Sequence, residues 1–236
     1  MTITLTPDER RRYKTHGRKK GFLKPKDETH LKECLPALTL TGGVDRQQLL
    51  SAFGGVTEST RLWLEIGFGN GDFLAHLAAL HPEDRFVGID VFLEGVSALL
   101  RRLERQGSDN VRVVVDNANV VLMERIPPDS LDRVVINFPD PWRKKRHHKR
   151  RLIQPPFLDL LAERMRRDGL LSLATDWGEY SDWMLEHLQA HPAFENCMDG
   201  GGFAPQPDEW IETRFQSKGQ KAGRPARHLL FRKVEG

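Results

Sequence analysis

Residues 62–72 read LWLEIGFGNGD, and this stretch decides the fold. Its first half, Leu62 to Ile66, is a mostly apolar run with the length of a buried strand. Three glycines then follow at every second position: Gly67, Gly69 and Gly71. Glycine is needed where a backbone turns sharply and lies close against a ligand, because a Cβ would block the approach. The pattern E-x-G-x-G-x-G therefore predicts a strand that ends in a ligand-binding turn.

Beyond this stretch, short apolar runs alternate with helical patterns. Strands are predicted at 62–66, 85–90, 111–115, 131–137 and 170–174. Helices are predicted at 71–80, 92–106, 118–125, 152–167 and 177–190. The alternation predicts a Rossmann-like α/β fold, in which a mostly parallel twisted sheet is flanked by helices and ligands bind at the carboxyl ends of the strands. Two weaker strands are predicted at 211–215 and 228–232.

The length and composition suit one large domain with a modest appendage. The chain has 236 residues, of which 39% are hydrophobic. We interpret residues 1–57 as a basic N-terminal arm, partly flexible, and residues 58–236 as the domain. The two cysteines are too few for a disulfide scaffold or a thiolate zinc site. No apolar run reaches the roughly 18 residues that cross a bilayer, and the N-terminus has no secretory leader. We expect a cytoplasmic protein without a membrane partner, either a monomer or a homodimer.

Positive charge is concentrated in three segments. Residues 1–30 carry nine Lys/Arg against four Asp/Glu, whereas 143–151 and 214–233 each carry seven Lys/Arg and no acidic residue. The net charge of the whole chain is only +3. Such segregation creates local potentials that attract a polyanion, although a single basic run is as often a solvated surface or a nuclear-localisation sequence. Three runs in one chain indicate a nucleic-acid partner.

The glycine-rich turn discriminates between cofactors. A dinucleotide-binding turn has Gly or Ala three residues after its second glycine, where this chain has Asp72, and a carboxylate there repels a pyrophosphate. A nicotinamide oxidoreductase is also disfavoured because no His or Tyr–Lys pair is placed for hydride transfer. Glu65 adds a second carboxylate beside the turn, and two acids suit a cationic ligand. S-adenosylmethionine, with a sulfonium and an ammonium group, is such a ligand.

Polar residues also follow the next two predicted strands. Asp90 ends the second strand, where an acidic side chain can accept hydrogen bonds from both ribose hydroxyls. Asn117 follows the third strand and is placed for the edge of an adenine. An acid at a strand end has a simpler alternative as the N-cap of the next helix, which applies to Asp90 and to Asp116, the residue before Asn117. Because they occur in order after successive strands, they together predict a nucleoside pocket.

The fourth predicted strand runs into the segment FPDPWRKKRHHKRR at 138–151. Pro139 and Pro141 stiffen the loop around Asp140, so this carboxylate loses little conformational freedom when it engages a substrate. Trp142 offers a flat face against which a base can stack. The segment therefore combines a candidate catalytic acid with a basic surface.

This segment resembles the F-P-D-P-W-x-K-x-R-H-x-K-R-R signature of the bacterial tRNA (guanine-N7)-methyltransferases. Further similarity to the family lies in LEIGFGNG at 64–71, TDW at 175–177 and TRFQ at 213–216. The resemblance covers residues 58–236 well and the basic arm loosely. It implies a class I S-adenosylmethionine-dependent methyltransferase that acts on N7 of a variable-loop guanine, at position 46, in tRNA.

By the same resemblance, two groups of residues would form the site. The donor would contact Glu65, Gly67, Gly69, Asp90, Asn117 and Asp140. The tRNA would contact Lys144, Asp176, Thr213, Arg214, Phe215 and Gln216. Three departures from the family pattern stand out. The family's Lys and Glu are Arg214 and Gln216 here, its usual Asp is Asn117, and the turn at 223–228 (GRPARH) is more basic.

Asp140 is the predicted catalytic residue. Guanine N7 has an exposed lone pair and no proton to lose, so an in-line methyl transfer needs positioning more than a general base. A carboxylate that accepts hydrogen bonds from N1 and the exocyclic amine would orient the ring and favour the positive charge that develops on it. Asp176 is the second candidate, with the N-cap of the following helix as its alternative.

The residues from Lys144 to Arg151 are expected to hold tRNA phosphates. The adjacent His147 and His148 would point apart on a helix and have no carboxylate or cysteine nearby in the sequence, so no metal is expected. Two other functions stay open. A methyltransferase acting on an exocyclic amine of another RNA base would typically have an N-P-P-aromatic loop, where this chain has NFPD at 137–140. An RNA-binding module that has lost catalysis is disfavoured by the intact acidic residues.

Overall fold

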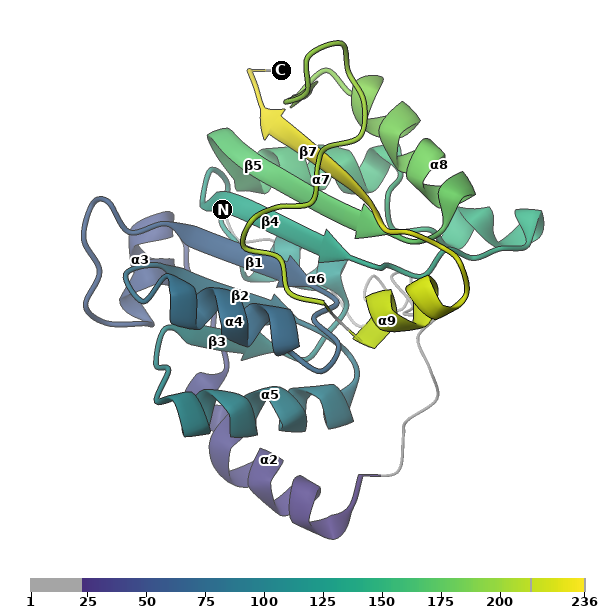
Figure 1. Cartoon of the computed structure of the whole chain (residues 1–236). Helices are drawn as coiled ribbons and strands as arrows, with labels where there is room; N and C mark the ends of the chain where they lie inside the picture. Colours follow the sequence, from purple (N-terminus) through teal and green to yellow (C-terminus); the bar gives the residue numbers. More distant parts are fainter. Residues whose placement is uncertain (1–22, 213, 236) are drawn as a thin grey trace.

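The computed structural model describes residues 23–212 and 214–235 (Figure 1). Its strands are β1 (Leu62–Ile66), β2 (Arg85–Ile89), β3 (Val111–Val114), β4 (Leu131–Asn137), β5 (Met165–Thr175), β6 (Phe194–Asn196) and β7 (Arg227–Lys233). They form one sheet in the order β3-β2-β1-β4-β5-β7-β6. The first five strands are parallel, and β7 runs antiparallel to both β5 and β6. The predicted, mostly parallel sheet is therefore confirmed.

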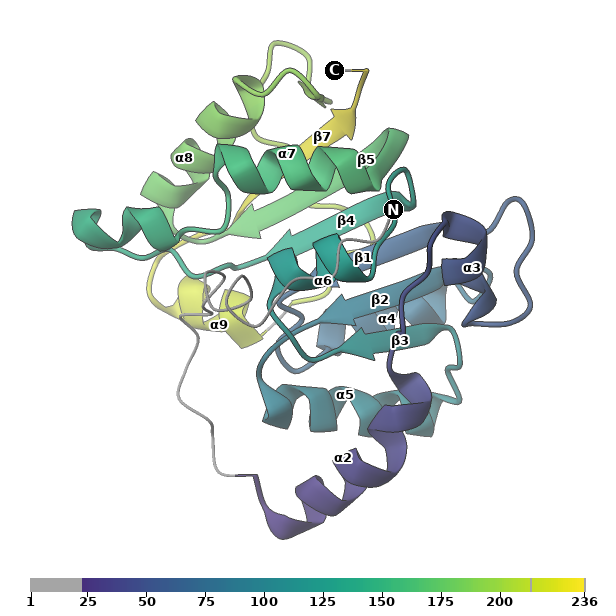
Figure 2. The same ribbon diagram turned by 180° about the vertical axis from the view of Figure 1, so that it is seen from behind.

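Helices cover both faces of this sheet. They are α2 (Pro25–Leu38), α3 (Arg46–Ser51), α4 (Asp72–Leu80), α5 (Leu93–Gln106), α6 (Ala118–Glu124), α7 (Pro155–Arg164), α8 (Gly178–Gln189), α9 (Arg214–Lys221) and a 3-10 helix η1 (Lys145–Arg150). Helix α4 lies in front of the sheet in Figure 1, whereas Figure 2 shows α6 and α7 against the opposite face. In the described ranges, no helix is long and apolar enough to cross a bilayer.

The core consists of two apolar layers, one on each face of the sheet. Successive side chains of a strand point to opposite faces, and both faces are covered here. In β1, Trp63 therefore packs in the layer beneath α4 and α5, while Leu62 and Leu64 pack in the layer beneath α6 and α7. The apolar runs that predicted the strands are continuous because both of these layers need them.

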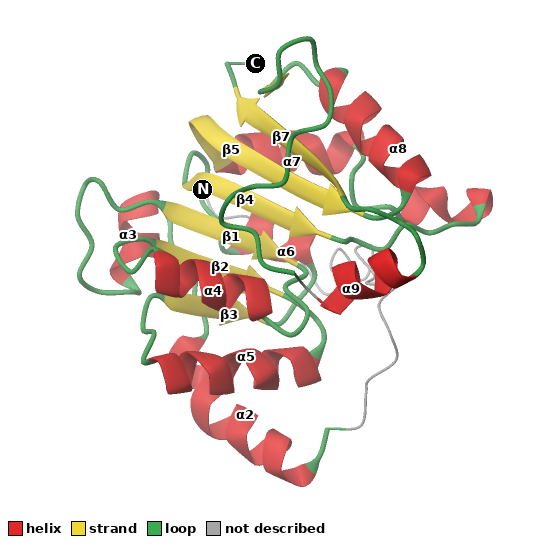
Figure 3. Ribbon diagram, in the orientation of Figure 1, coloured by secondary structure: helices red, strands yellow, loops and turns green. Residues whose placement is uncertain are grey.

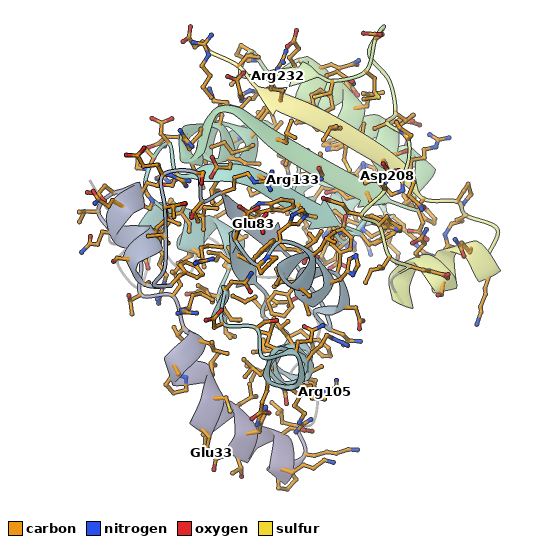
Figure 4. The ribbon with its side chains drawn as sticks, turned by 60° about the vertical axis from the view of Figure 1, so that its left-hand side comes forward. Glu33, Glu83, Arg105, Arg133, Asp208 and Arg232 are labelled. Carbon is orange, nitrogen blue, oxygen red and sulfur yellow. The ribbon has the colours of Figure 1, made fainter. Side chains whose placement is uncertain are left out.

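Residues 23–57 contain two helices that the sequence did not predict. Helix α2 runs alongside α5, with Glu33 on the first and Arg105 on the second (Figure 4), and Asp27 forms an ion pair with Arg101. Leu49 of α3 is fully buried in the same layer as the leucines of β1. Leu31, Cys34, Leu35 and Leu38 do have helical spacing, but in the sequence alone the short, mostly polar segment around Pro36 is interpreted as part of the arm. The division at residue 57 stays a prediction.

Three other boundaries differ from prediction. The strand predicted at 211–215 is wrong, because Arg214 begins helix α9. The free side of β7 is taken instead by β6, which was missed because it has only three residues. The helix predicted at 152–167 ends at Arg164, since β5 begins early, with Met165 paired to Leu131. Pairing with β4 thus overrides the local helical pattern there.

Candidate active site

The predicted site residues that the structure describes lie along one edge of the sheet. Parallel strands end on the same side, and the register places Ile66 opposite both Ile89 and Ile136, and Asn137 opposite Ala174. Predicted site residues therefore follow five neighbouring strand ends: Glu65, Asp90, Asn117, Asp140 and Asp176. Helix α9 lies at the same edge (Figure 3).

Glu65 is a buried acid with one unsatisfied carboxyl oxygen in the described part of the chain. Its side chain is only 3% exposed, and its Oε2 has no hydrogen-bond partner among the described residues. Burial raises its pKa from 4.5 to about 8, and the charges of Asp90 and Asp72 add to the rise. Such a group is costly to bury unless a ligand satisfies it. A cationic group, such as the ammonium of S-adenosylmethionine, fits this requirement.

The glycine-rich turn is held in place from two sides. Gly69 N donates to Asp90 Oδ2 at 2.7 Å, and Gly67 N donates to Ile89 O at 2.7 Å. Gly67 has φ +76°, and a Cβ on it would meet no atom of residues 23–212 or 214–235 within 4 Å. At Gly95, in the first turn of α5, a Cβ would lie 1.9 Å from Gly69 O. The backbone of the turn thus packs directly on α5 on one side, and no described residue covers it at Gly67.

Asp90 and Asn117 both bond to nearby backbone. Asp90 Oδ1 accepts from Phe92 N at 2.8 Å, and burial raises the pKa of Asp90. Asn117 is the N-cap of α6 and accepts from Asn119 N at 2.9 Å, so the cap is Asn117 and not Asp116. Carboxylate oxygens have several lone pairs, and Asp90 keeps acceptor capacity for a ribose. Asp72, in contrast to Glu65, has its charge compensated by an ion pair with Arg102.

The loop after β4 is constrained by its backbone. Phe138 and Trp142, on either side of Asp140, have φ of +50° and +45°, a left-handed conformation that is uncommon for bulky residues. Phe138 N donates to Ala174 O at 2.7 Å, which ties the start of the loop to the end of β5. The Asp140 side chain is exposed. Its charge adds to the rise in the pKa of Tyr180 that burial causes. Asp140 therefore faces outward, beside the start of α8.

Arg151 does not serve the role expected of it. It is 2% exposed, its Nε donates to Pro141 O at 3.0 Å, and its guanidinium lies 4.9 Å from the ring centroids of both Tyr180 and Trp183. A buried guanidinium cannot reach a phosphate. The expectation that Arg151 contacts phosphate is therefore wrong, and this arginine braces the Asp140 loop instead.

The rest of the basic segment is exposed. This surface comprises Arg143, Lys144, Lys145, Arg146, Lys149 and Arg150. Arg150 lies over Trp142, 5.1 Å from the ring centroid, and Arg143 lies 4.4 Å from that of Trp177. His148 Nε2 lies 3.4 Å from Glu179 Oε1, so tertiary structure supplies the carboxylate neighbour that the sequence around the histidines lacked. Arg151 shares this carboxylate at 3.2 Å, which gives His148 a place in an ion-pair cluster.

The predicted tRNA-binding residues occupy the end of β5 and the start of α9. Asp176 does not cap α8, because the N-cap residue of this helix is Trp177 and no side chain caps it. The Oδ2 atom of Asp176 instead accepts from Arg224 Nε at 2.9 Å. Gln216 is buried, and its Oε1 accepts from Trp210 Nε1 at 2.6 Å. Arg214 and Phe215 lie in the first turn of α9, and Thr213 lies outside the described residues.

Comparison with known proteins identifies the family. A family described as "Putative methyltransferase" matches residues 59–229. The tRNA (guanine-N(7)-)-methyltransferase of Magnetococcus marinus is 56% identical over 226 residues, which are 95% of this chain and 89% of that protein. The enzyme of the same name from Ralstonia nicotianae is 42% identical over 223 residues, or 94% and 87% of the two chains. The chain belongs to the tRNA (guanine-N(7)-)-methyltransferase family.

Solved structures of other methyltransferases share the fold of this tRNA (guanine-N(7)-)-methyltransferase family member. The 16S rRNA methyltransferase KamB has a TM-score of 0.57 at 13% identity, over 84% of this chain and 99% of its own. The aminoglycoside resistance methyltransferase NpmB1 has a TM-score of 0.55 at 19% identity, over 84% and 98%. At such identities the likeness concerns the fold alone, and it confirms the predicted class I methyltransferase architecture.

One group of possible metal ligands lies elsewhere in this family member. Among the described residues, His81, Glu83 and Asp84 bring ligand atoms within 4.8 Å of one another. They lie at the amino end of β2, opposite the predicted site, and Figure 4 labels Glu83. Asp84 already accepts from Trp63 Nε1 and Arg61, and His81 bonds to Glu209 at 2.8 Å. Protein partners thus account for two members of this group.

Proposed function

We propose that this protein transfers the methyl group of S-adenosylmethionine to N7 of a guanine in tRNA, at position 46 of the variable loop. The carrying observation is one sheet edge that combines Glu65, a buried acid whose Oε2 has no partner among the described residues, with the exposed and stiffened Asp140 and the basic surface around Lys144. Membership of the tRNA (guanine-N(7)-)-methyltransferase family supports the proposal.

Four elements would hold the donor. Glu65 would accept from its ammonium group, the open turn at Gly67 and Gly69 would lie against it, and Asp90 and Asn117 would contact its nucleoside. When bound, S-adenosylmethionine supplies an electrophilic methyl group. The protein's own part is to hold the ligand in a site where a cation satisfies a buried acid.

The acceptor guanine would be oriented by carboxylates. Asp140 would accept from the N1 and amine hydrogens of the ring, and its negative charge would stabilise the positive charge that appears as N7 is alkylated. Arg151 would keep the loop in place from beneath, through Pro141. The exposed residues from Lys144 to Arg150 would contact phosphates and supply affinity and register rather than base specificity.

Mapping of the modified base tests the reaction itself. After incubation with the protein and methyl-labelled donor, tRNA treated with borohydride and aniline should be cleaved at one variable-loop guanine. Incorporated label without cleavage would favour methylation of another RNA base. No incorporated label with retained tRNA binding would favour the non-catalytic RNA-binding module.

Asp140→Asn tests the catalytic residue. The variant keeps the shape of the side chain but loses the charge, so we expect kcat to fall about a hundredfold, while the affinities for donor and tRNA stay near wild type. Single-turnover methyl transfer and calorimetry measure these quantities. Asp159→Asn, which removes an exposed acid on α7, is the matched control. Wild-type turnover of Asp140→Asn would remove this residue from the mechanism.

A further inference from the structure

Two parts of the predicted tRNA-binding set are distant in sequence but adjacent in space. Asp176 ends β5, and the TRFQ residues open α9. Both are expected to contact the tRNA, so their relative position matters for how the substrate is held. The contacts at Gly219 and Arg224, near the end of α9, join them.

Arg224 makes a contact with each part. Its Nε donates to Asp176 Oδ2 at 2.9 Å, and its backbone N donates to Gly219 O, in α9, at 2.9 Å. Its guanidinium lies 5.9 Å from the ring centroid of Trp177, the residue after Asp176. The side chains of Arg224 and Asp176 are 34% and 22% exposed, so the pair is shielded only in part.

Gly219 brings α9 directly against Asp176. The glycine is buried, and a Cβ on it would lie 2.7 Å from Asp176 Oδ2 and 3.0 Å from Asp176 Cβ. Because only a residue without a side chain permits this approach, the position of α9 depends on it. The helix and the carboxylate are therefore in contact through backbone and held together by one arginine.

The contact suits a carboxylate that must present one oxygen. Within residues 23–212 and 214–235, Arg224 is the side-chain hydrogen-bond partner of Asp176, and it uses Oδ2 only. Oδ1 then remains available for a substrate hydrogen. A guanidinium is better suited to this contact than a lysine ammonium, because its planar N–H groups fix the direction of the hydrogen bond to Asp176. The guanidinium of Arg224 also lies over the indole ring of Trp177.

We propose that Arg224 is a positioning residue, which fixes the Asp176 carboxylate and seats α9 against it so that the acceptor guanine meets both parts in one geometry. The proposal rests on the proposed function and on the sequence-based prediction that Asp176 is the second carboxylate at the guanine. Arg224 also lines a surface hollow of about 330 Å³ with Asp176, Trp177 and Arg227, so the pair lies at a concave part of the surface. This assigns a role to the basic turn at 223–228.

The test compares two neighbouring arginines. Arg224→Gln removes the contact with Asp176, whereas Arg227→Gln removes the same charge from the same hollow but breaks a pair with Asp182 of α8. Both variants should lose tRNA affinity to a similar, small extent. Only Arg224→Gln should also lower kcat at saturating tRNA, by about tenfold, because misplacement of a substrate-positioning group affects the bound complex. Equal kcat for the two variants would overturn the proposal.

Three further measurements distinguish a positioning role of Arg224 from unfolding of the variant and from failure of the proposed reaction. Amide hydrogen exchange of residues 214–221 should become faster in Arg224→Gln and not in Arg227→Gln, whatever reaction the protein catalyses; unchanged exchange would overturn the proposal. Calorimetry should show donor binding intact. In combination with Asp176→Asn, Arg224→Gln should cause no further loss of kcat, whereas multiplied losses would contradict a shared role.

Gly219→Ala disturbs the contact between α9 and Asp176 while Arg224 stays in place. Its Cβ would press on Asp176, so kcat should fall as in Arg224→Gln, and wild-type kcat would count against the proposal. If wild-type protein fails to produce aniline-sensitive guanine, the proposed function fails, and the exchange experiment alone decides the role of Arg224 in seating α9.

Discussion

At the scale of single residues, Glu65 has the most unusual environment of the site. Its carboxyl group keeps its proton up to about pH 8 in the folded chain and releases it near pH 4.5 when unfolded. Between these values the folded state binds more protons than the unfolded state, so the free energy of unfolding falls as the pH rises. A cationic ligand would lower the pKa of Glu65, because it stabilises the ionised carboxylate, and would thereby reduce this loss of stability.

Glu65→Gln should remove this pH dependence. The amide does not ionise, so the free energy of unfolding of the variant should fall less than that of wild type between about pH 4.5 and pH 8. Urea denaturation across this window measures the slope. Glu104→Gln, which changes an exposed acid on α5, should keep the wild-type slope. A Glu65→Gln slope equal to wild type would mean that Glu65 ionises normally in the folded chain.

At the scale of elements, the segment from 143 to 151 divides into two roles. Its exposed lysines and arginines form a surface for phosphates, whereas Arg151 is buried and braces the Asp140 loop. Lys145→Gln should lower the slope of log K for tRNA against log salt by about one, because one phosphate contact is lost.

Arg151→Gln should leave the slope unchanged but lower kcat. Filter binding over a salt series measures the slope, and a reduced slope for Arg151→Gln would contradict its bracing role.

The elements differ in how well the sequence predicts them. Strands β1 to β4 and the glycine-rich turn have local causes, namely continuous apolar runs and backbone that only glycine adopts at Gly67, so their patterns were sufficient. Helix α9 and strand β6 depend on partners elsewhere. A strand of three residues is too short to show an alternating pattern. The pattern of residues 211–215 predicted a strand, but β6 pairs with the edge of β7 instead.

At the scale of the whole molecule, residues 23–57 share the core of the sheet. Leu49 is fully buried beside residues of β1 and β4, and Arg46 donates to Thr60 O and Asp132. Leu49→Ala should therefore lower the free energy of unfolding by about 2–5 kcal/mol, because it removes buried apolar surface and leaves a cavity. Urea denaturation measures the change, with Val44→Ala, at a 64% exposed side chain, as the control. A chain from residue 58 onward that melts like the full protein would show that the segment is dispensable.

The candidate site shows the same division between local and tertiary causes. The sequence by itself determined the alternation of strands β1 to β5 with helices α4 to α8, the glycines of the turn and the polar residues at successive strand ends, because each depends on a local pattern. Only the tertiary structure decided that Arg151 is buried, that Glu65 Oε2 has no partner among the described residues and that Arg224 bonds to Asp176. These properties depend on which residues meet through space, and Asp176 and Arg224 meet only because β7 returns antiparallel beside β5.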